Sequence, residues 1–221
     1  MRNSGQGTFF VIVGLVALAT VLVGYYAKDY VVQNILKRDV EDSIIVPERI
    51  KPVHGFILSC LKETGEKGVN LLGQQGGYIN IPRDPYSLTE LNLASNALTI
   101  YGNNNVAYWF YEQPNKVQFR QVPTEKDIQK QLSSYIDNNI IGCLNNFKDF
   151  PEYQIKQGNL KSNVVIDNNE VSFSLDFPIE IKIQDFEFKI NKYSQKINSP
   201  VLELYEKAKQ IFESLDNDNI L

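Results

Sequence analysis

The sequence predicts an α+β fold, in which an N-terminal transmembrane and stalk helix is followed by antiparallel β-hairpins packed with helices. Three observations lead to this prediction. Residues 8–27 are uncharged and predominantly apolar. Two later segments have the 3.6-residue periodicity of amphipathic helices, and each contains one of the two cysteines. Residues 164–190 contain runs of alternating apolar and polar residues separated by short polar turns, which is typical of β-hairpins.

The first element, residues 8–27, is long enough to cross a hydrocarbon core of about 30 Å as a helix. A secretory signal has a shorter apolar region, of about 7–15 residues, and then small residues at a cleavage site. Tyr25 and Tyr26 do not fit such a site but suit the membrane interface. We therefore expect a retained single-pass anchor in the lipid bilayer, preceded by a short tail, residues 1–7.

Small residues recur along one face of this helix, a pattern that suits packing against other membrane helices. They are Gly14, Ala17, Thr20 and Gly24. The same residue types are common in anchors that cross the membrane alone, so both interpretations stay open.

The tail and the start of the anchor read Asn-Ser-Gly-Gln-Gly-Thr, which resembles the archaeal class III signal sequence of type IV pilin-like proteins. Gly5, Gln6 and Thr8 match the residues around that family's cleavage site, whereas Phe10 stands where the family has glutamate. The resemblance implies processing between Gly5 and Gln6. It also gives an alternative function, that of a pilin-like filament subunit.

Residues 28–46 are expected to continue the membrane helix as a stalk, because apolar residues recur there at helical spacing without proline or glycine. Pro47 ends this helix. The remaining residues, 47–221, are expected to form the head domain, either as one unit or as two subdomains, 47–150 and 151–221.

Two helices are expected in the first part of the head. The first covers residues 53–72, where Gly65 and Gly68 weaken the helix and predict a bend or break. The second covers residues 124–147 and begins at Thr124, which resembles a capping box together with the aspartate three residues later.

Each of these helices carries one cysteine, Cys60 or Cys143. An even pair in an anchored protein predicts a disulfide bond, worth about 4 kcal/mol, if the head lies outside the cytoplasm. Two buried free thiols are the alternative. The basic residues predict the opposite orientation, because Lys28, Lys37 and Arg38 follow the anchor and only one arginine precedes it. Because of the cysteine pair, we favour a head that lies outside the cytoplasm.

Residues 60–65, CLKETG, and 71–79, LLGQQGGYI, resemble uncharacterised membrane-anchored surface proteins of small-genome archaea. In that family a helix runs into a Gln-Gly-Gly-Tyr-Ile turn. The resemblance implies a membrane location and this fold, adds no activity, and implies that relatives extend beyond Leu221.

The hairpins are predicted from β-rich runs on either side of short turns. The paired runs are 97–101 with 106–111, 164–166 with 171–177, and 179–183 with 186–190. In the last hairpin a two-residue loop would place Lys182 opposite Glu187 and Glu180 opposite Lys189, two attractive pairs. The amphipathic segment 200–215 is the expected cover for its apolar face.

Four consecutive aromatic residues, Tyr-Trp-Phe-Tyr, give the strongest candidate contact with a ligand. In a strand, Trp109 and Tyr111 would share one face, with Tyr101 near by and Arg83 and Asp84 as polar neighbours. Such a platform would suit a peptide, a glycan or an envelope protein. The alternative is that helices cover both faces and the rings are structural.

Neither catalysis nor a metal or cofactor is indicated. His54 is the only histidine, so a histidine metal cluster or a Ser-His-Asp triad would need it, and two isolated cysteines make no zinc site. The net charge of −4 and the lack of a basic stripe argue against nucleic acid as a partner.

We expect a non-enzymatic envelope protein that presents its head for binding or assembly. The less favoured alternatives are the pilin-like subunit and an envelope hydrolase with a carboxylate site.

Overall fold

The computed structural model describes residues 16, 21, 46–82, 95–100 and 104–217. The anchor, the stalk, the processing site and the small-residue face predicted above fall outside these residues, apart from Val16 and Val21, which are helical, and Val46, which is not. Within the described part of the chain, no helix combines the length and the apolar character that a membrane crossing requires. Val46–Leu221 form one compact unit, which is the unit described below.

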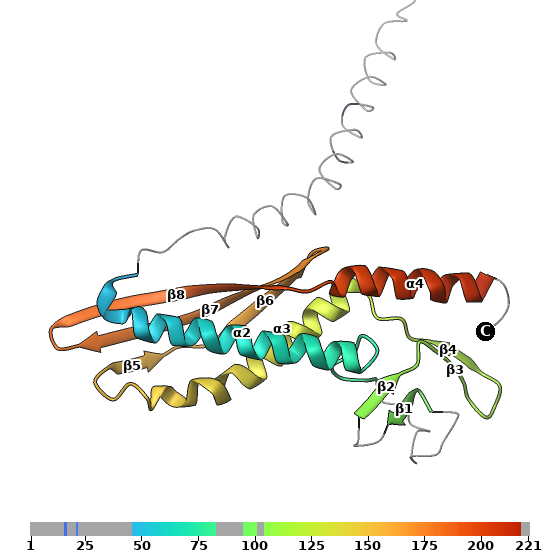
Figure 1. Ribbon diagram of the computed structural model, residues 1–221, viewed down its shortest axis with the longest axis horizontal. Helices are drawn as coiled ribbons and strands as arrows, with labels where there is room; N and C mark the ends of the chain where they lie inside the picture. Colours follow the sequence, from blue (N-terminus) through green and yellow to red (C-terminus); the bar gives the residue numbers. More distant parts are fainter. Residues whose placement is uncertain (1–15, 17–20, 22–45, 83–94, 101–103, 218–221) are drawn as a thin grey trace, which may run out of the picture. The chain divides into compact units, whose positions relative to one another are not determined.

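The main sheet of this unit has four antiparallel strands with β7 at its centre (Figure 1). The strands are β5 (Gln154–Gln157), β6 (Lys161–Ile166), β7 (Glu170–Ile183) and β8 (Phe186–Asn198). On one side β7 pairs with β8 along nearly its whole length. On the other side the first part of β7 pairs with β6 and the last part with β5. The mixed helix and antiparallel sheet confirm the α+β prediction for the head.

The register of the β7–β8 hairpin confirms the prediction made from its alternating pattern. Lys182 lies opposite Glu187, and Glu180 lies opposite Lys189, with which it forms an ion pair. Gln184 in the two-residue loop has a φ of 53°, as tight hairpin turns require.

Two long helices cover the apolar face of the sheet (Figure 1). α2 (Lys51–Gln74) packs on β8 and less extensively on β7, while α3 (Glu125–Leu144) packs on α2 and β6. One buried core joins both helices to the sheet. Its largest fully buried side chains include Ile57, Leu61, Leu132, Ile136, Phe173, Leu175 and Phe177.

The disulfide predicted between the two helices is present. Cys60 of α2 and Cys143 of α3 are bonded across 83 residues of sequence, and Cys60 is buried in the core. The capping box at the start of α3 is confirmed as well, since Thr124 and Asp127 exchange side-chain to backbone hydrogen bonds.

A break in the first helix, one of the two outcomes predicted for it, is absent, because α2 runs without interruption from Lys51 to Gln74. The two glycines instead make room for neighbouring rings. A Cβ atom on Gly65 would lie 2.5 Å from the Phe173 ring, and one on Gly68 would lie 2.9 Å from the Tyr135 ring. Their conformational cost is offset by close packing of α2 on the sheet and on α3.

The C-terminal helix does not cover the sheet, contrary to the prediction for residues 200–215. α4 (Val201–Asn217) follows β8 and leaves Leu204 and Ile211 about 60% exposed. The sheet face expected to receive α4 is already filled by α2 and α3. α4 is held instead by a hydrogen bond from the Tyr205 hydroxyl to the Pro123 carbonyl (2.8 Å) and by ring contacts.

Along the chain, the short elements come before, between and after the two long helices. They are β1 (Ala97–Ile100), β2 (Asn104–Ala107), β3 (Phe110–Glu112), β4 (Gln118–Arg120) and the 3-10 turns η1 (Glu48–Ile50) and η2 (Asn145–Phe147). β1 pairs with β2 and β3 with β4, so the predicted run 106–111 is divided between two hairpins.

Replacement of Gly65 by alanine is expected to lower the free energy of unfolding by about 1–3 kcal/mol, because the new methyl group overlaps the buried Phe173 ring. Gly55→Ala is the matched control in the same helix. Nothing lies within 4 Å of its added Cβ, so it should raise the stability by about 0.5–1 kcal/mol. Thermal unfolding followed by circular dichroism measures both variants, and equal effects would contradict the assigned packing.

Candidate functional site

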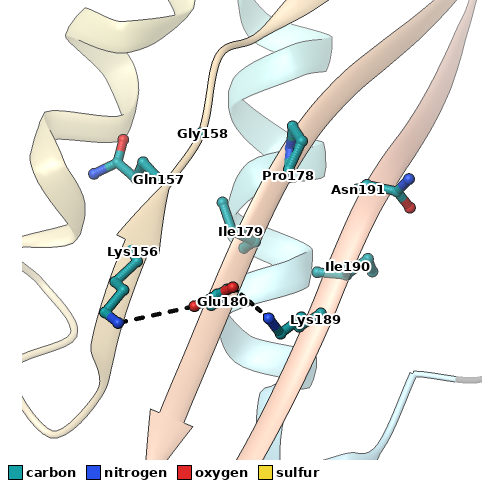
Figure 2. Close-up of a pocket in the computed structure, with 9 residues that line it drawn as sticks. All are labelled: Lys156, Gln157, Gly158, Pro178, Ile179, Glu180, Lys189, Ile190 and Asn191. Atoms are coloured by element: carbon teal, nitrogen blue, oxygen red, sulfur yellow. Dashed lines mark hydrogen bonds and ion pairs between the residues drawn. The ribbon is translucent and has the colours of Figure 1, made fainter.

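An open hollow of about 630 Å³ lies on the polar face of the sheet, opposite the helices (Figure 2). Residues 156–158 at the end of β5, 178–180 of β7 and 189–191 of β8 line it. We take this hollow as the candidate functional site.

The hollow forms where β7 changes partner. The register between β7 and β8 shifts between Asp176 and Ile179, at Pro178, which has no N–H group for the ladder. On the other side β5 has ended, and the backbone N–H of Gly158 donates to the Pro178 carbonyl (2.7 Å). A Cβ atom on Gly158 would lie 3.1 Å from that carbonyl oxygen, so glycine permits the close approach.

The charged groups of the hollow are two lysines on either side of one glutamate (Figure 2). Glu180 forms an ion pair with Lys189 and lies 3.9 Å from the Lys156 ammonium. The hydrogen bond from Lys189, supported by Lys156, lowers the pKa of the Glu180 carboxyl group. The same pair raises the pKa of Lys189. By formal charge, the two lysines and the glutamate together give the hollow one excess positive charge.

This arrangement suits binding more than catalysis. A lysine ammonium donates hydrogen bonds and attracts carboxylate or sulfate groups, while the amides of Gln157 and Asn191 can bond to hydroxyl or amide groups. Glu180 is held ionised and exposed, so it lacks the raised pKa of a general acid. The described residues contain no group of three or more His, Cys, Asp or Glu side chains arranged to hold a metal ion.

The aromatic residues predicted to form a platform have different partners. The Trp109 indole N–H donates to the Gly76 carbonyl (2.9 Å), and its ring meets the rings of Tyr205 and Phe212 edge-on at about 6 Å. Tyr111 stacks on Phe119 across the β3–β4 hairpin, at 5.2 Å. Trp109 thus contacts α4 through two rings, which agrees with the alternative that the aromatic residues have a structural role. Tyr101, Arg83 and Asp84 lie outside the described residues.

The hollow itself was not found by the sequence analysis, although one signal was available. Pro178 interrupts two alternating runs that otherwise read as one long strand, and proline inside a strand marks a bulge or an edge. That Lys156 would face Glu180 depended on the pairing of β5 with β7, which the sequence did not reveal.

His54, the single histidine, has a structural position in α2. Its ring stacks on the ring of Tyr193 of β8 (5.5 Å between centroids), and burial lowers its pKa below the usual value of 6.5. Tyr193 is almost fully buried, and within the described structure its hydroxyl group has no hydrogen-bond partner. The pair belongs to the packing of α2 on β8.

Comparisons with protein-family models, with curated proteins and with solved structures gave no match to this chain. The functional conclusion therefore depends on the residues and on their geometry.

The lowered pKa of His54 predicts that the folded protein loses stability on mild acidification. The folded state favours the neutral ring, so below about pH 6.5 the unfolded chain takes up the proton first and the free energy of unfolding falls. The His54→Gln variant should lose less stability than the wild type between about pH 7 and pH 5.5. Equal losses, measured by urea unfolding at the two pH values, would assign the acid sensitivity to other groups.

Proposed function

We propose that the chain is a single-pass, membrane-anchored protein of the cell envelope that presents its α+β head for binding outside the cytoplasm. The Cys60–Cys143 bond is the observation that carries this proposal. Disulfide bonds persist in oxidising compartments and are rare in the cytosol. The apolar segment 8–27 supplies the membrane attachment.

The position of the disulfide supports a structural role for it. It ties α2 to α3, the two helices that together cover the sheet, and Cys60 is 1% exposed. A redox-active disulfide would be expected to be accessible to its partner proteins. A bond between two core helices, with Cys60 buried and Cys143 partly buried, instead stabilises a domain that has to persist outside the cell.

The two faces of the sheet support a binding role for the head. One face is buried by helices, whereas the other carries the Lys-Glu-Lys hollow and has no helix packed over it among the described elements. We assign the hollow as the ligand-contact surface for anionic or hydroxylated groups of an envelope partner.

The compartment is tested by thiol labelling of the full-length chain expressed in membranes. A maleimide-polymer reagent should shift the denatured protein on a gel only after reduction. The matched control is Cys60→Ser with Cys143→Ser, which should not shift in either condition. Two thiols that react without reduction would contradict the extracytoplasmic placement.

Membrane attachment is tested separately on the same preparation. The full-length chain should stay with the membranes during alkaline carbonate extraction and dissolve in detergent, as expected for a span of about twenty apolar residues. A matched variant with two leucines of the segment replaced, Leu15→Arg and Leu22→Arg, should be released. Release of the wild type without detergent would contradict the anchor.

A further inference from the structure

We propose that the free edge of β8 binds an extended peptide segment with acidic side chains at alternate positions, which adds to the sheet as a further antiparallel or parallel strand. This inference names a partner class for the proposed binding role and rests on that role. β8 contributes residues 189–191 to the hollow described above, and the added segment would lie on the other side of β8, away from β7.

β8 is a long edge strand. It covers Phe186–Asn198, and among the described residues it pairs only with β7. The closing pair of a two-residue hairpin is hydrogen-bonded, and such pairs alternate with pairs that are not. From the closing pair of Ile183 and Phe186, it follows that the backbone groups of Glu187 and Lys189 point away from β7, toward the free edge.

The charges on the polar face alternate from strand to strand. Asp176 and Glu180 of β7 lie between lysines on both sides: Lys161 and Lys156 on β6 and β5, and Lys192 and Lys189 on β8. Farther along, Lys196 of β8 forms an ion pair with Glu170 of β7 (3.1 Å). Beside the hairpin turn the two charges are exchanged: there β7 carries the basic residue, Lys182, and β8 carries the acidic one, Glu187.

This alternation predicts the chemistry of the next strand. Acidic residues of β7 have basic neighbours on two sides, whereas the lysines of β8 have an acidic strand on one side only. A strand added at the β8 edge would continue the pattern with acidic side chains on the polar face, and each such cross-strand pair is worth about 0.2–1 kcal/mol.

A second hollow shows where one end of the added segment would lie. It has a volume of about 410 Å³ and is lined by Lys62, Glu66, Val69 and Asn70 of α2 and by residues 196–199 at the end of β8. No β7 residue lines it, so it lies between α2 and the end of β8. A groove between an edge strand and a helix is a recurrent way to bind an extended peptide.

The position of α2 favours a single extended segment over a second copy of this chain. α2 packs on β8, at the same edge of the sheet. If β8 paired with β8 of another copy, the α2 helices of the two copies would be brought close together where the two sheets join. A peptide without a helical layer avoids this conflict.

The test uses the full-length chain in detergent and a labelled synthetic peptide of about ten residues that alternates glutamate with threonine. Its matched control has the same composition with the glutamates grouped at one end. Fluorescence anisotropy should show binding of the alternating peptide and at least about fivefold weaker binding of the grouped one. Backbone amide exchange should slow in residues 186–198 when the alternating peptide is bound.

Two matched variants outside the hollow locate the site. Lys192→Ala, on β8, should lower the affinity about twofold to fivefold, whereas Lys161→Ala, which lies opposite the same Asp176 on β6, should change it less than about 1.5-fold. Failure of the alternating peptide to bind, equal binding of the grouped peptide, or equal effects of the two variants would overturn the proposal. So would a dimer that protects the β8 amides without peptide. None of these outcomes bears on the carbonate or labelling tests.

Discussion

The burial of one face of β7 is the constraint on which the rest of the structure depends. Six alternate residues of this strand are at most 1% exposed: Val171, Phe173, Leu175, Phe177, Ile179 and Ile181. A slip of one residue against β8 would turn all six toward water, so this face fixes the register of the whole sheet. It also requires a continuous apolar cover, which only a pair of long helices held side by side supplies.

Close packing of α2 and α3 on that face explains several residues that look unfavourable in isolation. Glycine in a helix interior costs about 1 kcal/mol relative to alanine, yet Gly65 lets the Phe173 ring approach the α2 backbone. The Cys60–Cys143 bond fixes the distance between the two helices within the same layer. Helix spacing, ring packing and sheet register are therefore parts of one arrangement.

How much of this fold the sequence predicts depends on how far apart the interacting residues lie along the chain. The register of the last hairpin follows from a local alternation and a two-residue turn, and the start of α3 follows from Thr124 and Asp127, so both were predicted correctly. The disulfide was predicted from an even pair of cysteines in a chain with an apolar anchor segment, which needs no knowledge of distant contacts.

The errors arise where distant segments compete for the same surface. The amphipathic pattern of α4 shows that one of its faces needs partners, but it does not say that α2 and α3 already occupy the sheet. The contacts of the Trp109 ring with Tyr205 and Phe212, which lie far along the chain, likewise do not follow from the local sequence, and its role as a ligand contact stays a prediction. The hollow at Pro178 also depends on distant pairing, because β5 and β6 meet different halves of β7.

Side chains along β7 point alternately to the two faces of the sheet, and this alternation explains the charged polar face as well as the apolar core. Residues between the buried positions of β7 face away from the core. Two of them, Asp176 and Glu180, are acidic and lie between lysines of the neighbouring strands. In the interior of the sheet each of these charges has neighbours on two sides. At β8 the alternation ends, while the backbone of Glu187 and Lys189 still points outward and α2 covers only the apolar face. Electrostatic complementarity and unpaired backbone groups thus coincide at one edge, and that coincidence separates β8 from an ordinary edge strand, whose lysines serve only to prevent association.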